Sequence, residues 1–195
     1  MTTDKTIGEK PTKKLAPKKR TMRPGGGKSK GSGFEGQIAK KLSLVLAPLN
    51  FMRSPGSGAR VGGKNFEKFG QMFGEEALAI FVADVVPINE KKEGVVFLHS
   101  IECKSYKTPD GFTSLVSGTA NVFKWFEESV VDAEKTNKNP LLIFKWNNTP
   151  VFVAALSHTE SVIKPSLTLS NGNRTLNIFY LDDLLQDKAF WVKSV

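Results

Sequence analysis

The sequence has little cysteine and no long apolar run. One cysteine, Cys103, stands among 195 residues, which excludes an internal disulfide and a cysteine-based zinc site. No apolar run approaches the roughly 18 residues that a membrane helix needs. The N-terminus is charged and lacks the apolar core of a signal peptide. We therefore expect an intracellular, cytoplasmic protein without a membrane segment.

Charge is balanced along most of the chain but not at its N-terminus. The net charge is +9, and residues 1–30 hold ten Lys or Arg against two acids. The other 165 residues hold eighteen basic and seventeen acidic side chains. Residues 1–32 also offer almost nothing to bury, which predicts a disordered basic tail before one domain over 33–195. This tail is either a solubilising segment or an arm that binds phosphates and releases their counterions.

Apolar periodicity predicts helices and strands in alternation. Helical spacing of apolar residues begins at Phe34, with Ser32 as the expected N-cap and Pro48 near the helix end. "LAIFVADVV" and "GVVFLHSIECKSY" predict two strands that pair across "PINEKKEG". "SLVSGTANVFKWFEESVVDAEKT" predicts one long helix, "PLLIFKW" and "PVFVAALS" two strands, and "TLNIFYLDDLLQDKAFWV" a last strand and a short helix. This order predicts an α/β fold with a mixed central sheet flanked by helices.

Two carboxylates and a lysine fall on the two strands expected to pair. Asp84 is the one charge in an apolar strand, and burying it is costly unless it is paired or binds a metal. Glu102 and Lys104 are two residues apart, so a strand sends both to one face. Two carboxylates suit Mg²⁺, with Mn²⁺ as a substitute. Such a metal activates water against a phosphodiester, and a nearby lysine orients that water.

The spacing of these residues resembles the signature of the PD-(D/E)xK nuclease superfamily. Asp84 is followed by Glu102-Cys103-Lys104, and "KGSGFEGQIAKKL" with "NFMRSPGSGA" is similar to the opening of its Holliday-junction resolvase branch. The resemblance covers about residues 30–155 and implies a restriction-endonuclease-like fold. It also implies a homodimer with paired sites that cleaves branched DNA, such as four-way junctions, at the nucleoid or at replicating DNA.

The same resemblance assigns roles to single residues. It implies that Glu35 completes the metal site with Asp84 and Glu102, that Lys104 positions the attacking water, and that Ser57 lies at the scissile phosphate. The residues expected to contact DNA are Lys30, Arg53, Ser57, Arg60, Lys107 and Lys145.

The chain departs from the resolvase pattern at three places. Ala83 stands where relatives have proline, and residues 61–78 look like an insertion. The long helix has no glutamine to face the site, which leaves that role to Glu127, Glu128, Lys124 or no residue.

Other functions fit parts of the sequence. The same fold serves repair, restriction-like or flap nucleases, and an inert version would bind DNA without cutting it. "GARVGGKN" nearly matches an NTPase phosphate loop, but Asn65 lacks the hydroxyl that binds Mg²⁺. His99 is three residues before Glu102 and should face the other way, and Cys103 is expected in the core.

Overall fold

The computed structural model describes residues 26–54 and 82–194. Its centre is a seven-stranded sheet in the order β1-β2-β4-β5-β6-β8-β7. Strands β4 and β5 run parallel, and the other neighbouring pairs are antiparallel. The strands are β1 (Phe51–Arg53), β2 (Val85–Pro87), β4 (His99–Tyr106), β5 (Asn139–Trp146), β6 (Phe152–Leu156), β7 (Leu167–Ser170) and β8 (Thr175–Tyr180).

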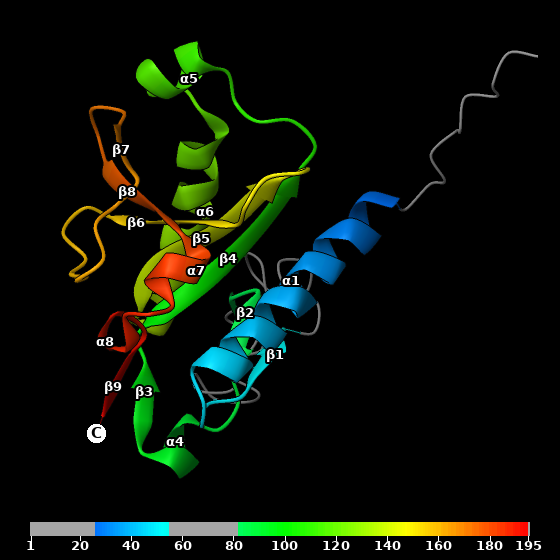
Figure 1. Cartoon of the computed structure of the whole chain (residues 1–195), viewed down its shortest axis with the longest axis vertical. Helices are drawn as coiled ribbons and strands as arrows, with labels where there is room; N and C mark the ends of the chain where they lie inside the picture. Colours follow the sequence, from blue (N-terminus) through cyan, green and yellow to red (C-terminus); the bar gives the residue numbers. More distant parts are fainter. Residues whose placement is uncertain (1–25, 55–81, 195) are drawn as a thin grey trace, which may run out of the picture.

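Helices cover both faces of this sheet (Figure 1). The helices in the described ranges are α1 (Gly26–Val45), α4 (Glu90–Glu93), α5 (Phe112–Val116), α6 (Asn121–Thr136), α7 (Leu181–Leu184) and α8 (Lys188–Trp191). Alternate residues of β5 separate the two cores, because side chains of a strand alternate between its faces. Leu141 and Ile143 pack with α1, α7 and α8, whereas Leu142 and Phe144 pack with α6. The predicted α/β fold with a mixed central sheet is confirmed.

The crossover from β4 to β5 runs through α6 and places that helix beside β4. The single long helix expected here is instead two helices, α5 and α6, because the chain turns at Gly118. Gly118 has φ +71°, and a Cβ there would lie 2.6 Å from the Asn171 Cα. Only glycine fits both this conformation and this close approach. None of the helices in the described ranges is long and apolar enough to cross a membrane.

Helix α1 begins earlier than the sequence pattern indicates. It starts at Gly26, so Ser32 lies inside the helix and is not its N-cap, and the expected tail boundary at residue 32 also falls within α1. The sequence pattern starts later because Phe34 is the first described α1 side chain in the core. The part of α1 before Phe34 has no apolar periodicity, so the sequence does not predict that it is helical.

The strand expected after "PINEKKEG" is divided in two. Its first part, β3 (Val95–Phe97), leaves the central sheet and pairs with β9 (Val192–Ser194), while β4 pairs with β2 at Ile101 and Val85 as expected. The rings of Phe97 and Trp191 stack with centroids 6.2 Å apart, and both are fully buried. This aromatic contact explains why β3 joins the C-terminal strand.

His99 lies in that aromatic layer, away from Glu102 as predicted. Its Nε2 is 2.6 Å from the Phe190 carbonyl oxygen, and its ring stacks on Phe190 at a centroid distance of 4.5 Å. Burial lowers the pKa of His99 to about 4, although the Phe190 hydrogen bond opposes the shift. His99 is therefore neutral at physiological pH and has a structural role.

Candidate active site

A cavity of about 340 Å³ opens where α1, β4 and α6 meet the segment just before β2. Four residues singled out from the sequence line it together. The other four lining residues were not assigned to the site from the sequence, although Glu128 was one of three candidates on its helix. The lining residues are Glu35, Val82, Asp84, Glu102, Cys103, Lys104, Glu128 and Asp132. The cavity is thus rich in carboxylates and contains one ammonium group.

Asp84 is held at the edge of β4 by the backbone around it. The residue is 7% exposed and lies in a bend immediately before β2. Its backbone N–H donates to the Ile101 carbonyl at 2.8 Å, and its Oδ2 accepts from the Cys103 N–H at 2.8 Å. Of the strand predicted over residues 78–86, the described part begins only at Val85, and residues 78–81 lie outside the described residues. The Asp84 carboxylate nevertheless lies beside the Glu102–Lys104 segment of β4.

Lys104 bridges two carboxylates from different elements. Its Nζ lies 2.5 Å from Glu102 Oε1 on the same strand and 2.6 Å from Glu128 Oε2 on α6. Burial alone would lower the pKa of Lys104, but these two carboxylates outweigh it and raise the pKa above its usual value. Lys104 is therefore a fixed cation and hydrogen-bond donor, not a general base.

Glu102 is in an environment that disfavours its negative charge. Its pKa is raised to about 8, first by burial and then by the charge of Asp84, while Lys104 acts in the opposite direction. Burial also raises the pKa of the Cys103 thiol, and Asp84 adds to that shift. Cys103 is consequently a neutral core residue, as the sequence predicts.

The donor groups of the cavity fit a hard divalent cation. Among the residues in the two described ranges, no three His, Cys, Asp or Glu side chains converge as a ready ligand set. Glu35 instead pairs with Arg53, and Glu102 pairs with Lys104. Carboxylate oxygens are still the ligands that Mg²⁺ prefers. A cation between Asp84 and Glu102 would offset the repulsion that raises the pKa of Glu102.

A family model described as "Phage putative PDDEXK endonuclease" matches residues 26–182. The chain belongs to this family. Every residue that lines the cavity falls within the matched range. Searches of curated proteins and of solved structures gave no match.

Membership of the PDDEXK endonuclease family settles the general activity. The protein is a nuclease of the PD-(D/E)xK superfamily, phage type, and DNA is its substrate. Nucleases of this superfamily generally use divalent metals, which agrees with the carboxylates in the cavity.

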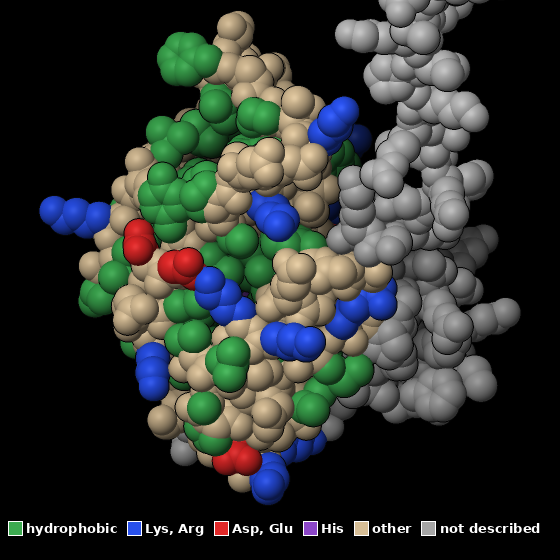
Figure 2. Space-filling view, turned by 45° about the vertical axis from the view of Figure 1, so that its right-hand side comes forward, with side chains coloured by type: hydrophobic (Ala, Val, Ile, Leu, Met, Phe, Trp, Pro, Cys, Tyr) green, Lys and Arg blue, Asp and Glu red, His purple; other side chains and the backbone are tan. Residues whose placement is uncertain are grey.

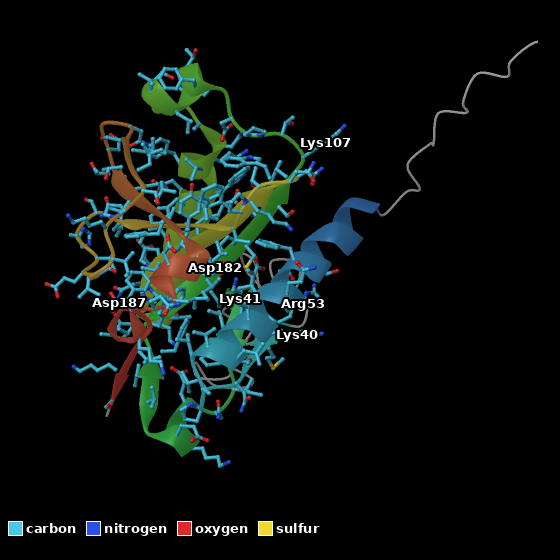
Figure 3. The ribbon with its side chains drawn as sticks, in the orientation of Figure 1. Lys40, Lys41, Arg53, Lys107, Asp182 and Asp187 are labelled. Atoms are coloured by element: carbon cyan, nitrogen blue, oxygen red, sulfur yellow. The ribbon has the colours of Figure 1, made fainter. Side chains whose placement is uncertain are left out.

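The residues expected to contact DNA that the structure describes lie on β1, just beyond β4 and on β5. Arg53 lies beside α1 and pairs with Glu35, and exposed Lys107 projects beyond the end of β4 (Figure 3). The Nζ of Lys145 lies 5.4 Å from the centroid of the Phe34 ring. Ser57 and Arg60 lie outside the described residues, as does the side chain of Lys30. One face of the molecule shows more basic than acidic side chains (Figure 2).

Helix α6 contributes two acids to the lining of the cavity. The sequence left three candidates on this helix, and the structure brings Glu128 to Lys104. Glu127 instead pairs with Arg174, and Lys124 is exposed. Asp132 was not singled out, although its position four residues after Glu128 puts both on one side of the helix. That spacing was the available signal.

Replacing Glu128 with alanine is expected to slow DNA cleavage by roughly tenfold. Lys104 would lose one of the two carboxylates that fix its position. Single-turnover rates at saturating DNA, with DNA affinity measured separately, would check this, and Glu128→Gln should restore much of the rate. Glu127→Ala is the matched control, because its partner Arg174 lies away from the cavity. An equal loss in both variants would contradict a role through Lys104.

Proposed function

We propose that the protein is a Mg²⁺-dependent endonuclease that cleaves branched DNA, with the Holliday junction as its substrate. The observation that carries the proposal is the cavity in which Asp84 and Glu102 lie beside the cationic Lys104. Branched DNA is favoured by the similarity of Lys30, Gly31 and Glu35, followed by Arg53, Ser57 and Gly58, to the opening of junction resolvases.

Asp84 and Glu102 would hold the metal ion, with Glu35 completing the site. Mg²⁺ supplies the charge that polarises a phosphoryl oxygen and lowers the pKa of water. Lys104 would donate hydrogen bonds to the attacking water or to the developing phosphorane charge, since it keeps its proton at neutral pH. Glu128 would hold Lys104 in that position.

The basic groups around the cavity would bind the DNA backbone. Arg53, Lys107 and Lys145 are the described members of this set, and Lys30, Ser57 and Arg60 are the others proposed. Contacts to phosphates fix the position of DNA but do not read its sequence. The basic segment before α1 would add affinity in the same way, as an arm of the nuclease domain.

A junction resolvase must make two symmetric cuts. We therefore expect a homodimer whose two-fold axis relates two identical sites. Inside the cell such a dimer would work at the nucleoid or at replicating DNA.

Cleavage of defined DNAs tests the proposed substrate. The protein is incubated with Mg²⁺ and a four-way junction, a flap, a linear duplex or a single strand. Paired symmetric nicks in the junction alone are the expected result. Equal cutting of the linear duplex would contradict the junction substrate and leave a general nuclease. Binding without cutting, in Mg²⁺ and in Mn²⁺, would contradict catalysis and indicate an inert nuclease fold.

A further inference from the structure

Helix α6 and strand β4 form a series of side-chain pairs that continues past the cavity. The helix returns from the end of β4 to the start of the parallel strand β5, so it runs opposite to β4. Every second residue of β4 points toward the helix, and on α6 the residues that point toward the strand recur every three or four positions. In order along β4, Lys104 pairs with Glu128 and Tyr106 stacks on Trp125.

The last pair is aromatic and half open to solvent. The rings of Tyr106 and Trp125 stack with centroids 4.5 Å apart and an interplanar angle of 28°. Trp125 is 3% exposed, whereas Tyr106 is 50% exposed. Trp125 therefore fixes the tyrosine ring from the core side and leaves it accessible from outside.

Two exposed lysines are the sequence neighbours of this aromatic pair. Lys107 follows Tyr106 and Lys124 precedes Trp125, and both lysines are exposed. The nearby acid Asp110 accepts hydrogen bonds from the backbone and side-chain nitrogens of Asn121, at 3.1 and 2.6 Å. An accessible aromatic ring is the surface on which an unpaired base stacks, and lysines of the same segments can bind the phosphates of that strand.

The aromatic pair is close to the cavity. A strand rises about 3.3 Å per residue, so Tyr106 is roughly 7 Å from Lys104 along β4 and on the same face of that strand. A base stacked on Tyr106 would therefore belong to a nucleotide near the phosphate at Lys104.

We propose that Tyr106, supported by Trp125, is a stacking platform for one unpaired base next to the scissile phosphate. The platform would accept a base that has left its stack at the branch point of the junction. This inference rests on the proposed function in one respect, since it takes the scissile phosphate to lie in the cavity at Glu102.

The test is a double-mutant cycle between Tyr106 and the base itself. Binding is measured with full-length protein carrying Glu102→Gln, so that the result does not depend on cleavage. One four-way junction has an unpaired thymine at its branch point, and the other has an abasic residue there. The base should strengthen binding by about tenfold, the scale of base–aromatic stacking, and Tyr106→Ala should remove that difference.

Three further variants interpret the result. Tyr106→Phe should keep the difference, because it keeps the ring. Tyr180→Ala should also keep it, because Tyr180 is 40% exposed but lies on β8, beside Asp182 and Asp183. Lys107→Ala should weaken the binding of both DNAs equally. If Tyr106→Ala weakens the binding of both DNAs equally or of neither, the platform is wrong. The proposed function fails separately, if the unmutated protein cuts no DNA or cuts the linear duplex as well as the junction.

Discussion

Glutamine in place of Glu102 is expected to abolish DNA cleavage while the chain stays folded. The substitution removes one of the two carboxylates proposed to hold the metal and alters the partner of Lys104. Metal ions supply several kcal/mol of transition-state stabilisation, so we expect a loss on the order of 10³-fold in the cleavage rate. The rate is measured in Mg²⁺ under single-turnover conditions, with product resolved on a denaturing gel.

Thermal unfolding separates this catalytic effect from misfolding. In EDTA at pH 8, Glu102→Gln should unfold at a temperature no lower than the unmutated protein. The reason is that burial and Asp84 raise the pKa of Glu102 to about 8, so its charge does not stabilise the fold. Glu127→Gln provides a control at an exposed glutamate of α6. Full activity of Glu102→Gln would exclude this carboxylate from the mechanism.

Removal of the divalent metal is expected to slow DNA cleavage by about as much as the Glu102→Gln substitution does. EDTA should abolish product formation, and excess Mg²⁺ should restore it. A ligand that binds the folded state alone stabilises it by about 2.7 kcal/mol at 100 times its dissociation constant. The melting temperature should therefore rise with Mg²⁺ concentration.

The thermal shift tests the proposed ligands independently of activity. Asp84→Asn and Glu102→Gln should each lose most of the Mg²⁺-dependent rise in melting temperature. Lys107→Ala should keep it, since Lys107 is exposed at the end of β4. Cleavage that persists in EDTA would refute the metal mechanism. A rise that is unchanged in both carboxylate variants would place the metal elsewhere.

The sequence predicted the fold well where burial imposes a regular spacing of apolar residues. The apolar run of β5 predicted a strand, and each face of that strand packs against a different helix layer. The edge strand β7 was not predicted, because three of its four residues are exposed and it has no apolar alternation. Boundaries failed where backbone geometry decided them, as at Gly118 and at the N-terminal extension of α1.

The sequence predicted those parts of the site that depend only on residues close together in the chain. The period of a strand puts Glu102 and Lys104 on one face, and the structure pairs them. The choice of Glu128 over Glu127 needed the angle at which α6 crosses β4, which local sequence does not specify. The same crossing angle brings Trp125 against Tyr106, and the types of these two residues do not predict that contact.

The small sheet of β3 and β9 has a consequence for the order in which the molecule folds. Val95 pairs with Ser194, and the Leu98 N–H donates to the Trp191 carbonyl at 2.9 Å. Contacts so distant in sequence close late and slow folding. The ribosome makes strand β4 well before Trp191, whose carbonyl binds the Leu98 N–H just ahead of that strand. A growing chain therefore carries Glu102 and Lys104 before Trp191 can anchor the start of β4, and we expect the cavity to be completed only after β9 is made.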